Sequence, residues 1–277
     1  MLYWPEFEFI FRLDVPALLP HVAAIEAYQE AASTRVLPPP WQKQPAPHVG
    51  QGFQSGLPAE QPSALNQVEV RKQQLLMSNS GQAWAWVKQR FVPRSPPHSL
   101  NDILTMHRMA SEETGARGGA LRTSGVQVGR REAEGIHLGA PVESLPRLIN
   151  QYVQFVNGGD VSGLPAPIHA LVAHFFFTAI HPFDDGNGRV SRLVSAAILF
   201  QRGYNGHGFY AIQNHFYQNA LKYHTLLQRC WKQPLPFDLT AFVAFGMEGL
   251  VTELQGINHF IKVKLHRSVE RAGLRTL

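Results

Sequence analysis

The segment 181–192, HPFDDGNGRVSR, gathers residue types that can carry out chemistry on a phosphate group. It lies between two strongly apolar helical stretches, at about 168–179 and 190–198, so its polar side chains are presented where buried elements meet. A loop between core helices needs turn residues, but it does not need an imidazole, two carboxylates, an amide and two guanidinium groups. The segment is therefore a candidate functional loop.

The second half of this segment has the features of an anion site. Gly186, Asn187 and Gly188 open the helix that follows, and a helix start presents free N–H groups and the positive end of its dipole. Glycine also lets the backbone approach a phosphate closely. Arg189 and Arg192 are three residues apart on one helix face, and each offers a planar fork of donors suited to phosphate oxygens.

The first half supplies a base and a metal ligand. His181 has the side chain in this loop whose unperturbed pKa, about 6.5, suits proton abstraction near neutrality. Asp185 can hold Mg²⁺, which usually binds one or two carboxylates plus phosphate oxygens. Taken singly, a histidine at a helix end is more often a cap or core partner, and GNG is more often a plain turn. Together, these groups within one short segment indicate a phosphoryl-type transfer site.

The segment resembles the signature of the Fic family, H-P-F-x-[D/E]-G-N-G-R-x-x-R, and every fixed position matches. Further resemblances cover roughly residues 99–250. They lie in the helix entering the motif, the strand of the target-binding flap and the helix after the active site, namely AHFFFTAIHPF (173–183), LRTSGVQVG (121–129) and NALKYHTLLQ (219–228). The aromatic start, WPEFEF, is similar to an N-terminal extension common in bacterial members.

The resemblance implies a role for each residue of the motif. His181 would be the general base that takes the proton from a Ser, Thr or Tyr hydroxyl, and Asp185 would hold Mg²⁺ across the α- and β-phosphates of ATP. Asn187 would contact the attacked α-phosphate within an anion hole, and two arginines would grip the β- and γ-phosphates. The implied phosphate-binding residues are Gly186, Asn187, Gly188, Arg189 and Arg192.

The implied activity is that of a protein adenylyltransferase, which moves AMP from ATP onto a hydroxyl of a target protein and releases pyrophosphate. The target would bind through the hairpin flap, residues 121–138, by strand addition. Without the motif beside it, this hairpin would be read as a structural cover. The target protein and the modified residue type cannot be read from the sequence.

Alternative functions remain open on the same residues. The scaffold can also transfer UMP, phosphocholine or phosphate, although an intact GNGR favours AMP. A nucleotide-sensing regulator without turnover is a second alternative, against which the intact His181 argues. A P-loop NTPase is excluded because the sequence contains no G-x-x-x-x-G-K-[ST].

One family feature is missing from the sequence. Many members carry an inhibitory helix, [S/T]-x-x-x-E-[G/N], whose glutamate pairs with the last arginine of the signature. The nearest candidate, SALNQV at 63–68, has Gln67 and Val68 in place of the last two fixed residues. We therefore expect self-inhibition to be weak, absent or supplied by another protein. The same gap casts doubt on de-AMPylation.

Three further side chains occupy positions typical of the family. We interpret His107 and His174 as core or hydrogen-bonding residues, because each lies beside an apolar face. Tyr223 either stacks near the adenine or is a packed aromatic residue.

Periodicity predicts an all-α fold with one small β-hairpin, and the resemblance implies a Fic-type helical bundle with this hairpin as a flap beside the active-site loop. Ser99 and Asp102 begin a helix over 99–109, and amphipathic faces follow at 145–156, 168–179 and 190–198. Another helix starts at Asp14, and a long one runs from 239. The hairpin is indicated by alternation around Gln127 and His137. Phe7, Phe9 and Phe11 alternate with polar residues in a strand or extended segment.

Composition divides the chain into four parts. We predict an N-terminal extension at 1–36, a Pro/Gly/Gln-rich linker or loop at 37–63, the catalytic domain at 64–250 and a basic C-terminal helix at 251–277. The charges of the last part are read as a solvated helix face rather than as a nucleic-acid site. They are Lys262, Lys264, Arg267, Arg271 and Arg275.

The 277 residues carry a formal charge of +5 and one cysteine, Cys230. A single cysteine cannot form an internal disulfide, which fits a reducing compartment. The start is a poor signal peptide, and no apolar run approaches the length of a membrane span. We therefore expect a cytoplasmic protein that contacts no membrane. Nucleic acid is not indicated, and the oligomeric state stays open, with a homodimer as one option.

Overall fold

A computed structural model describes residues 7–33, 67–114, 117–128, 137–206, 208 and 212–271 of the chain. The regular secondary structure of the described part is helical apart from two pairs of two-residue strands, which confirms the predicted all-α class with a small hairpin. The helices are α1 (Val15–Ser33), α3 (Gln67–Arg90), α4 (Leu100–Ala110), η3 (Val142–Ser144), α5 (Leu145–Asn157), α6 (Gly159–Ser162), α7 (Ala166–Ile180), α8 (Asn187–Gln201), α9 (Gln213–Gln218), α10 (Ala220–Trp231) and α11 (Thr240–Arg271). The strands are β1 (Phe11–Arg12), β2 (Gln127–Val128), β3 (His137–Leu138) and β4 (Phe237–Asp238).

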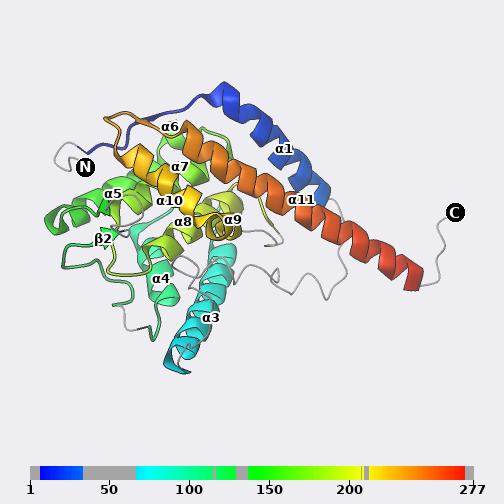
Figure 1. Ribbon diagram of the computed structural model, residues 1–277, viewed down its shortest axis with the longest axis horizontal. Coiled ribbons are helices and arrows are strands. Elements are labelled where there is room, and N and C mark those ends of the chain that lie inside the picture. The colour runs from blue at the N-terminus through cyan, green and yellow to red at the C-terminus, as the bar shows by residue number, and fades with distance from the viewer. Residues whose placement is uncertain are drawn as a thin grey trace.

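Helices α7 and α8, which follow each other in the chain and pack together, form the centre of the fold (Figure 1). Every residue of α7 is buried, as is every residue of α8 except Gly188 and Gln201. A helix that is apolar all round must lie inside a fold, so the composition of α7 itself dictates its central place. The hydroxyl of Ser195 on α8 donates to the carbonyl of Ala170 on α7 at 3.0 Å. The loop 181–186 between these helices is therefore anchored at both ends.

Helix α4 begins as the sequence predicted. The Ser99 hydroxyl accepts the Asp102 N–H at 3.2 Å, and an Asp102 carboxylate oxygen accepts the Ser99 N–H at 2.9 Å. This reciprocal capping box satisfies donors that the first turn of a helix leaves free. The helix brings His107 beneath the loop that joins α7 to α8.

The N-terminal aromatic segment packs on the core. Phe7 is buried and Phe9 and Phe11 are half-buried, whereas the residues between them are exposed, as the alternation predicted. Regular strand hydrogen bonding is limited to two residues, because β1 pairs in parallel with the equally short β4. Phe9 stacks on Phe155 with ring centroids 5.1 Å apart and packs against Phe176 at 5.2 Å. Aromatic packing holds this segment more than strand pairing does.

Helices α1 and α11 lie side by side along one flank of the molecule, and the C-terminal end of α11 extends beyond α1 (Figure 1). The predicted inward face of α1, Leu18, Val22 and Ile25, is buried. Helix α11 is continuous across residues 250 and 251, where composition suggested a boundary, and the division into four parts stays a prediction. The predicted linker, 37–63, lies outside the described residues.

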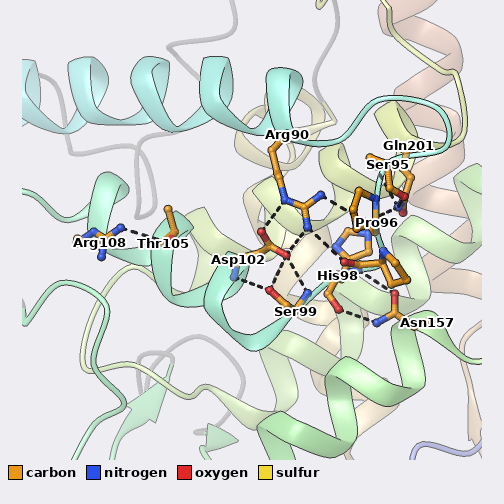
Figure 2. A network of polar contacts seen from close by, with 11 residues as sticks. Arg90, Ser95, Pro96, His98, Ser99, Asp102, Thr105, Arg108, Asn157 and Gln201 are labelled. Atoms are coloured by element: carbon orange, nitrogen blue, oxygen red, sulfur yellow. Dashed lines mark hydrogen bonds and ion pairs between the residues drawn. The ribbon is translucent and has the colours of Figure 1, made fainter.

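A polar network joins the ends of α3, α5 and α8 to the start of α4 (Figure 2). Arg90 donates to both carboxylate oxygens of Asp102 at 2.9 Å, from Nε and from Nη2. Asn157 bonds the backbone N–H and carbonyl of His98, at 3.0 and 2.8 Å. We call this set the Arg90 network; it comprises Arg90, Ser95, Pro96, His98, Ser99, Asp102, Asn157 and Gln201.

Within the described part of the chain, no helix is both long enough and apolar enough to cross a membrane.

Candidate active site

His181 ends α7 in a left-handed conformation, with φ of 53° and ψ of 61°. A residue with a Cβ rarely adopts this conformation, which costs on the order of 1–3 kcal/mol unless the surroundings enforce it. The His181 N–H still closes the last turn of the helix by donating to the Phe177 carbonyl at 3.1 Å. The chain therefore turns sharply at the predicted base, and the turn carries the imidazole out of the helix into the loop.

The His181 imidazole is set up to accept a proton through Nε2. Its Nδ1 lies 3.3 Å from the Thr178 carbonyl, which can only accept, so Nδ1 carries the hydrogen and Nε2 carries the lone pair. Burial lowers the pKa of His181 from its usual 6.5 to about 4, the Thr178 contact opposes this, and nearby His137 and Arg122 lower it further. The ring is therefore neutral at physiological pH.

Gly186 sits at the start of α8 with φ of 83°, in the left-handed region that favours glycine. There is no room for a side chain at this position. A Cβ would lie 3.1 Å from Arg189 Nη2, 3.2 Å from Ser111 Oγ and 3.3 Å from His107 Cδ2. No side chain of the described residues caps the N-terminus of α8, so its first N–H groups are available to a bound anion.

The two arginines of the motif are buried with unused donors. Arg189 is fully buried and Arg192 is 8% exposed. Arg189 Nε and Nη1 and Arg192 Nε and Nη2 have no hydrogen-bond partner among the described residues. The Arg192 side chain folds back towards the start of α8: a Cβ built on Gly188 would lie 3.1 Å from Arg192 Nη1. Burial lowers the pKa of Arg192 to about 10, Tyr223 opposes this, and the charge of Arg189 lowers it further.

Buried polar groups in native proteins are almost always hydrogen-bonded, so donors left unpaired on two adjacent guanidinium groups point to a missing acceptor. Two like charges side by side also repel, which a bound anion relieves. A polyphosphate supplies both the acceptor oxygens and the negative charge. The predicted placement of these two arginines on one face is what the structure shows.

Asp185 is the half-exposed carboxylate of the loop. Its Oδ1 accepts the Gly186 N–H at 2.6 Å, and its Oδ2 lies 3.2 Å from Arg189 Nη2, with 52% of the side chain exposed. The described residues contain no group of three or more histidines, cysteines or acids that could hold a metal by themselves. One accessible carboxylate beside an anion site fits Mg²⁺, which takes its remaining ligands from phosphates and water.

Asn187 is used differently from the role that the resemblance implied. Its Oδ1 accepts the Phe183 N–H at 2.9 Å, and its Nδ2 donates to the Phe183 carbonyl at 2.8 Å. The side chain thus closes the loop on itself and is 2% exposed. Its main-chain N–H remains at the helix start. A contact from Asn187 to a phosphate stays a prediction, and in this conformation it would be made by that N–H.

His107 supports the loop from below, as a core hydrogen-bonding residue. Its ring stacks on Phe183 with centroids 3.7 Å apart and an interplanar angle of 6°. Nδ1 accepts the Gly119 N–H at 3.0 Å, so Nε2 carries the hydrogen and donates to the Asp185 carbonyl, also at 3.0 Å. Burial lowers the pKa of His107 to about 4, which keeps it in this neutral form.

His174 and Tyr223 are packed residues behind Arg192. Both are buried, and His174 Nε2 is hydrogen-bonded to the Tyr223 hydroxyl at 2.8 Å. Burial raises the pKa of Tyr223 well above its usual value, and the charge of Arg192 opposes the rise. The packing interpretation of these side chains is confirmed, and Tyr223 is 8% exposed, which leaves little of its ring to stack on a base.

Residues 97–199 match the family model described as Fic/DOC. The chain is 33% identical over 107 residues to the protein adenylyltransferase Fic of Drosophila erecta, a match that covers 38% of this chain and 20% of that protein. It is 31% identical over 123 residues to the protein of the same name from Aedes aegypti, covering 44% and 23%. The chain thus spans about a fifth of the length of these curated relatives.

Solved structures show the same architecture. Fic-1 of C. elegans, residues 134–508, has a TM-score of 0.67 at 16% identity, covering 90% of this chain and 74% of that one. A Fic family protein from Desulfovibrio desulfuricans G20 has a TM-score of 0.57 at 18% identity, covering 87% and 66%. The fold, the complete signature and the family match agree. Residues 97–199 therefore match the Fic/DOC family, and the chain has the fold of the Fic structures.

Proposed function

We propose that this protein is a protein adenylyltransferase that transfers AMP from ATP to a Ser, Thr or Tyr hydroxyl of another protein. The observation that carries the proposal is the pair of buried arginines, Arg189 and Arg192, whose donors are unpaired beside the uncapped start of α8. The neutral imidazole of His181 lies at the other end of the same short loop. Similarity to curated protein adenylyltransferases over residues of this region supports it.

In the proposed step the hydroxyl oxygen of the target attacks the α-phosphorus of ATP, and the bond from that phosphorus to the bridging oxygen breaks. His181 takes the hydroxyl proton on Nε2, and pyrophosphate leaves. The main-chain N–H groups of Asn187 and Gly188, at the start of α8, would stabilise the oxygens of the α-phosphate, and Gly186, whose own N–H donates to Asp185 Oδ1, would let the phosphate approach. Positioning and charge stabilisation dominate such a displacement, so little covalent chemistry is asked of the protein.

The arginines would bind the leaving group. Arg189 and Arg192 would donate their unpaired N–H groups to the β- and γ-phosphates and neutralise the charge that pyrophosphate gains as it departs. Asp185 would hold Mg²⁺, which supplies further charge neutralisation of the triphosphate when bound. Arg189 keeps the Asp185 carboxylate near the helix start through their contact at 3.2 Å.

The target protein would dock on the hairpin. Within the described residues β2 pairs with β3, Gln127 opposite Leu138 and Val128 opposite His137, and the outer edge of β2 would receive the added strand. Such pairing uses backbone groups and selects for an extended segment more than for a sequence.

The test is incubation of the protein with Mg²⁺ and a cell lysate, with ATP labelled at either the α- or the γ-phosphate. Protein-bound label is expected from the α position alone. His181→Ala should lower the rate of labelling by about 10²–10⁴-fold, the range for loss of a general base, while ATP affinity changes less than threefold. His224→Ala, at an exposed position on α10, is the matched control. Label retained from the γ position would identify a kinase instead and refute the proposal.

A further inference from the structure

Four consecutive backbone carbonyls around His181 all accept hydrogen bonds from the hairpin and its two feet, by which we mean residues 122–126 before β2 and 139–140 after β3. Arg122 of the first foot makes two of the bonds, Ala140 of the second foot makes one, and His137 of β3 makes one. The four bonds run from His137 Nε2 to Ala179 O (2.8 Å), from Ala140 N to Ile180 O (3.0 Å), from Arg122 Nε to His181 O (2.8 Å) and from Arg122 N to Pro182 O (3.0 Å).

These bonds complete the C-terminus of α7. The last carbonyls of a helix lack intrahelical partners, and here the hairpin supplies the partners for Ala179 and Ile180. His181 follows directly, in the left-handed conformation that needs support from its surroundings. The hairpin and the turn that presents the base are thus hydrogen-bonded into one unit.

Arg122 contributes most to this unit. The residue is 2% exposed, and its guanidinium donates to three carbonyls: those of His181 at 2.8 Å, Ser124 at 2.7 Å and Ala140. The Ser124 carbonyl lies on the foot before β2 and the Ala140 carbonyl on the foot after β3. One planar side chain therefore bridges both feet of the hairpin and the backbone of His181.

We propose that Arg122 is a positioning residue, which fixes His181 Nε2 relative to the hairpin edge on which the target strand would lie. The inference rests on the proposed adenylyl transfer. A hydroxyl on an added strand can meet the base only when the strand and the imidazole are held in register. Arg122 holds that register through the backbone and need not touch either substrate.

Gly139 offers a second way to disturb the same contact. A Cβ on this residue would lie 2.7 Å from Val126 Cγ1, 2.9 Å from Arg122 Nη2 and 3.1 Å from His181 Cβ. Its own N–H donates to the Val126 carbonyl at 3.1 Å, within the hairpin. Gly139→Ala thus inserts a methyl group between the hairpin, the guanidinium and the base without removing Arg122.

The experiment combines amide-resolved hydrogen exchange with α-labelled ATP transfer into a lysate, for wild type, Arg122→Gln and Arg122→Lys. Arg147→Gln, at an exposed position on α5, is the control. In Arg122→Gln we expect exchange at the Gly139 and Ala140 amides to accelerate at least tenfold while α7 and α8 keep their protection. Transfer should fall at least thirtyfold, mainly in kcat, with ATP affinity within threefold. Arg122→Lys keeps the charge without the planar fork and should be intermediate.

Two results would overturn the inference: transfer by Arg122→Gln within twofold of wild type, or loss of protection in α7 and α8 together with the hairpin, which would make Arg122 a general folding residue. If Arg122→Gln does not fold, Gly139→Ala decides by the same measurements. A wild type that transfers no α-label defeats the proposed function, and the exchange data still show whether Arg122 joins the hairpin to His181.

Discussion

The half-buried Arg90 and the buried arginines of the motif, Arg189 and Arg192, differ in their hydrogen-bond partners. In the Arg90 network the guanidinium forms a two-point contact with Asp102 and also reaches the Pro96 and Pro97 carbonyls, at 3.4 and 3.3 Å (Figure 2). In the motif, Arg189 has one carboxylate contact and two unpaired nitrogens, and Arg192 also has two unpaired nitrogens within the described residues.

The proposed function explains the difference: Arg90 stabilises the fold through its own acceptors, whereas Arg189 and Arg192 would find their acceptors in a bound polyphosphate. Leaving a buried charge unpaired destabilises a protein, so selection for stability alone would have supplied acceptors at the motif as it did for Arg90. The unpaired donors are explained when a polyphosphate is the intended acceptor. Substituting an arginine in the motif should therefore lower activity more than stability, whereas substituting Arg90 should lower stability more than activity.

Arg192→Met should show the larger effect on activity. Removing a donor that stabilises charge in the transition state costs roughly 10²–10³-fold in rate, and we expect transfer of α-labelled AMP to fall by that factor. The melting temperature should stay level or rise, because methionine fills the site without an unpaired charge. A clear loss of stability with activity retained would remove the distinction between the two regions.

Arg90→Met should show the reverse. It removes the charged partner of the Asp102 carboxylate, which has 6% of its side chain exposed and keeps only its contacts with Ser99. Breaking such a partly buried pair costs up to about 3 kcal/mol of unfolding free energy. Urea denaturation measures the loss. At a temperature where the variant is folded, its rate of AMP transfer should match the wild type within twofold.

Ligand protection sharpens the comparison. ATP with Mg²⁺ at a hundred times its dissociation constant should stabilise the wild type by about 2.7 kcal/mol. Arg90→Met should gain a similar amount, whereas Arg192→Met at the same ATP concentration should gain less than a third of it. Thermal melts with and without nucleotide measure this. Equal protection of both variants would show that Arg192 does not bind the nucleotide.

Histidines should behave alike in the two regions, which gives the smallest expected difference. Burial lowers the pKa of His98 in the Arg90 network and of His181 in the motif to about 4. Both are neutral when folded and become charged on unfolding below pH 6.5, so their stabilisation is complete above pH 6.5 and is lost as the pH falls towards 4.

The matching measurement is urea denaturation between pH 7 and 5. His98→Gln and His181→Gln should each lose up to about 1.4 kcal/mol per pH unit from the wild-type slope below pH 6.5. A slope that changes in one variant but not in the other would show that the two imidazoles have different environments after all.

Local features of this protein were predictable from sequence because each is set by neighbours along the chain. The Ser99–Asp102 capping box, the apolar faces of the helices and the clustering of the motif around an uncapped helix start follow from spacing alone. The arginine pair was predicted for the same reason, since residues three apart on a helix share a face.

Features that depend on distant partners were not predictable. Sequence spacing does not reveal that the Asn187 amide closes on Phe183, nor that the Arg122 guanidinium would be buried against the carbonyl of His181, 59 residues away. Arg122 lies in the segment that resembles the flap strand, but an arginine there reads equally well as an exposed residue. Its role emerged from its acceptors and its burial.

The pairing of α1 with α11 has a practical consequence for deletion experiments. Asn258 of α11 donates to the Tyr28 carbonyl at 3.0 Å, Gln255 donates to the Tyr28 hydroxyl at 3.1 Å, and buried Leu254 lies on the same long helix. A protein shortened from its N-terminus past residue 33 would bare the apolar stripe that α1 covers. Self-association of such a protein would then result from the loss of a helix partner. An increase in activity on shortening can be assigned to release from inhibition only after the shortened protein has been shown to be monomeric.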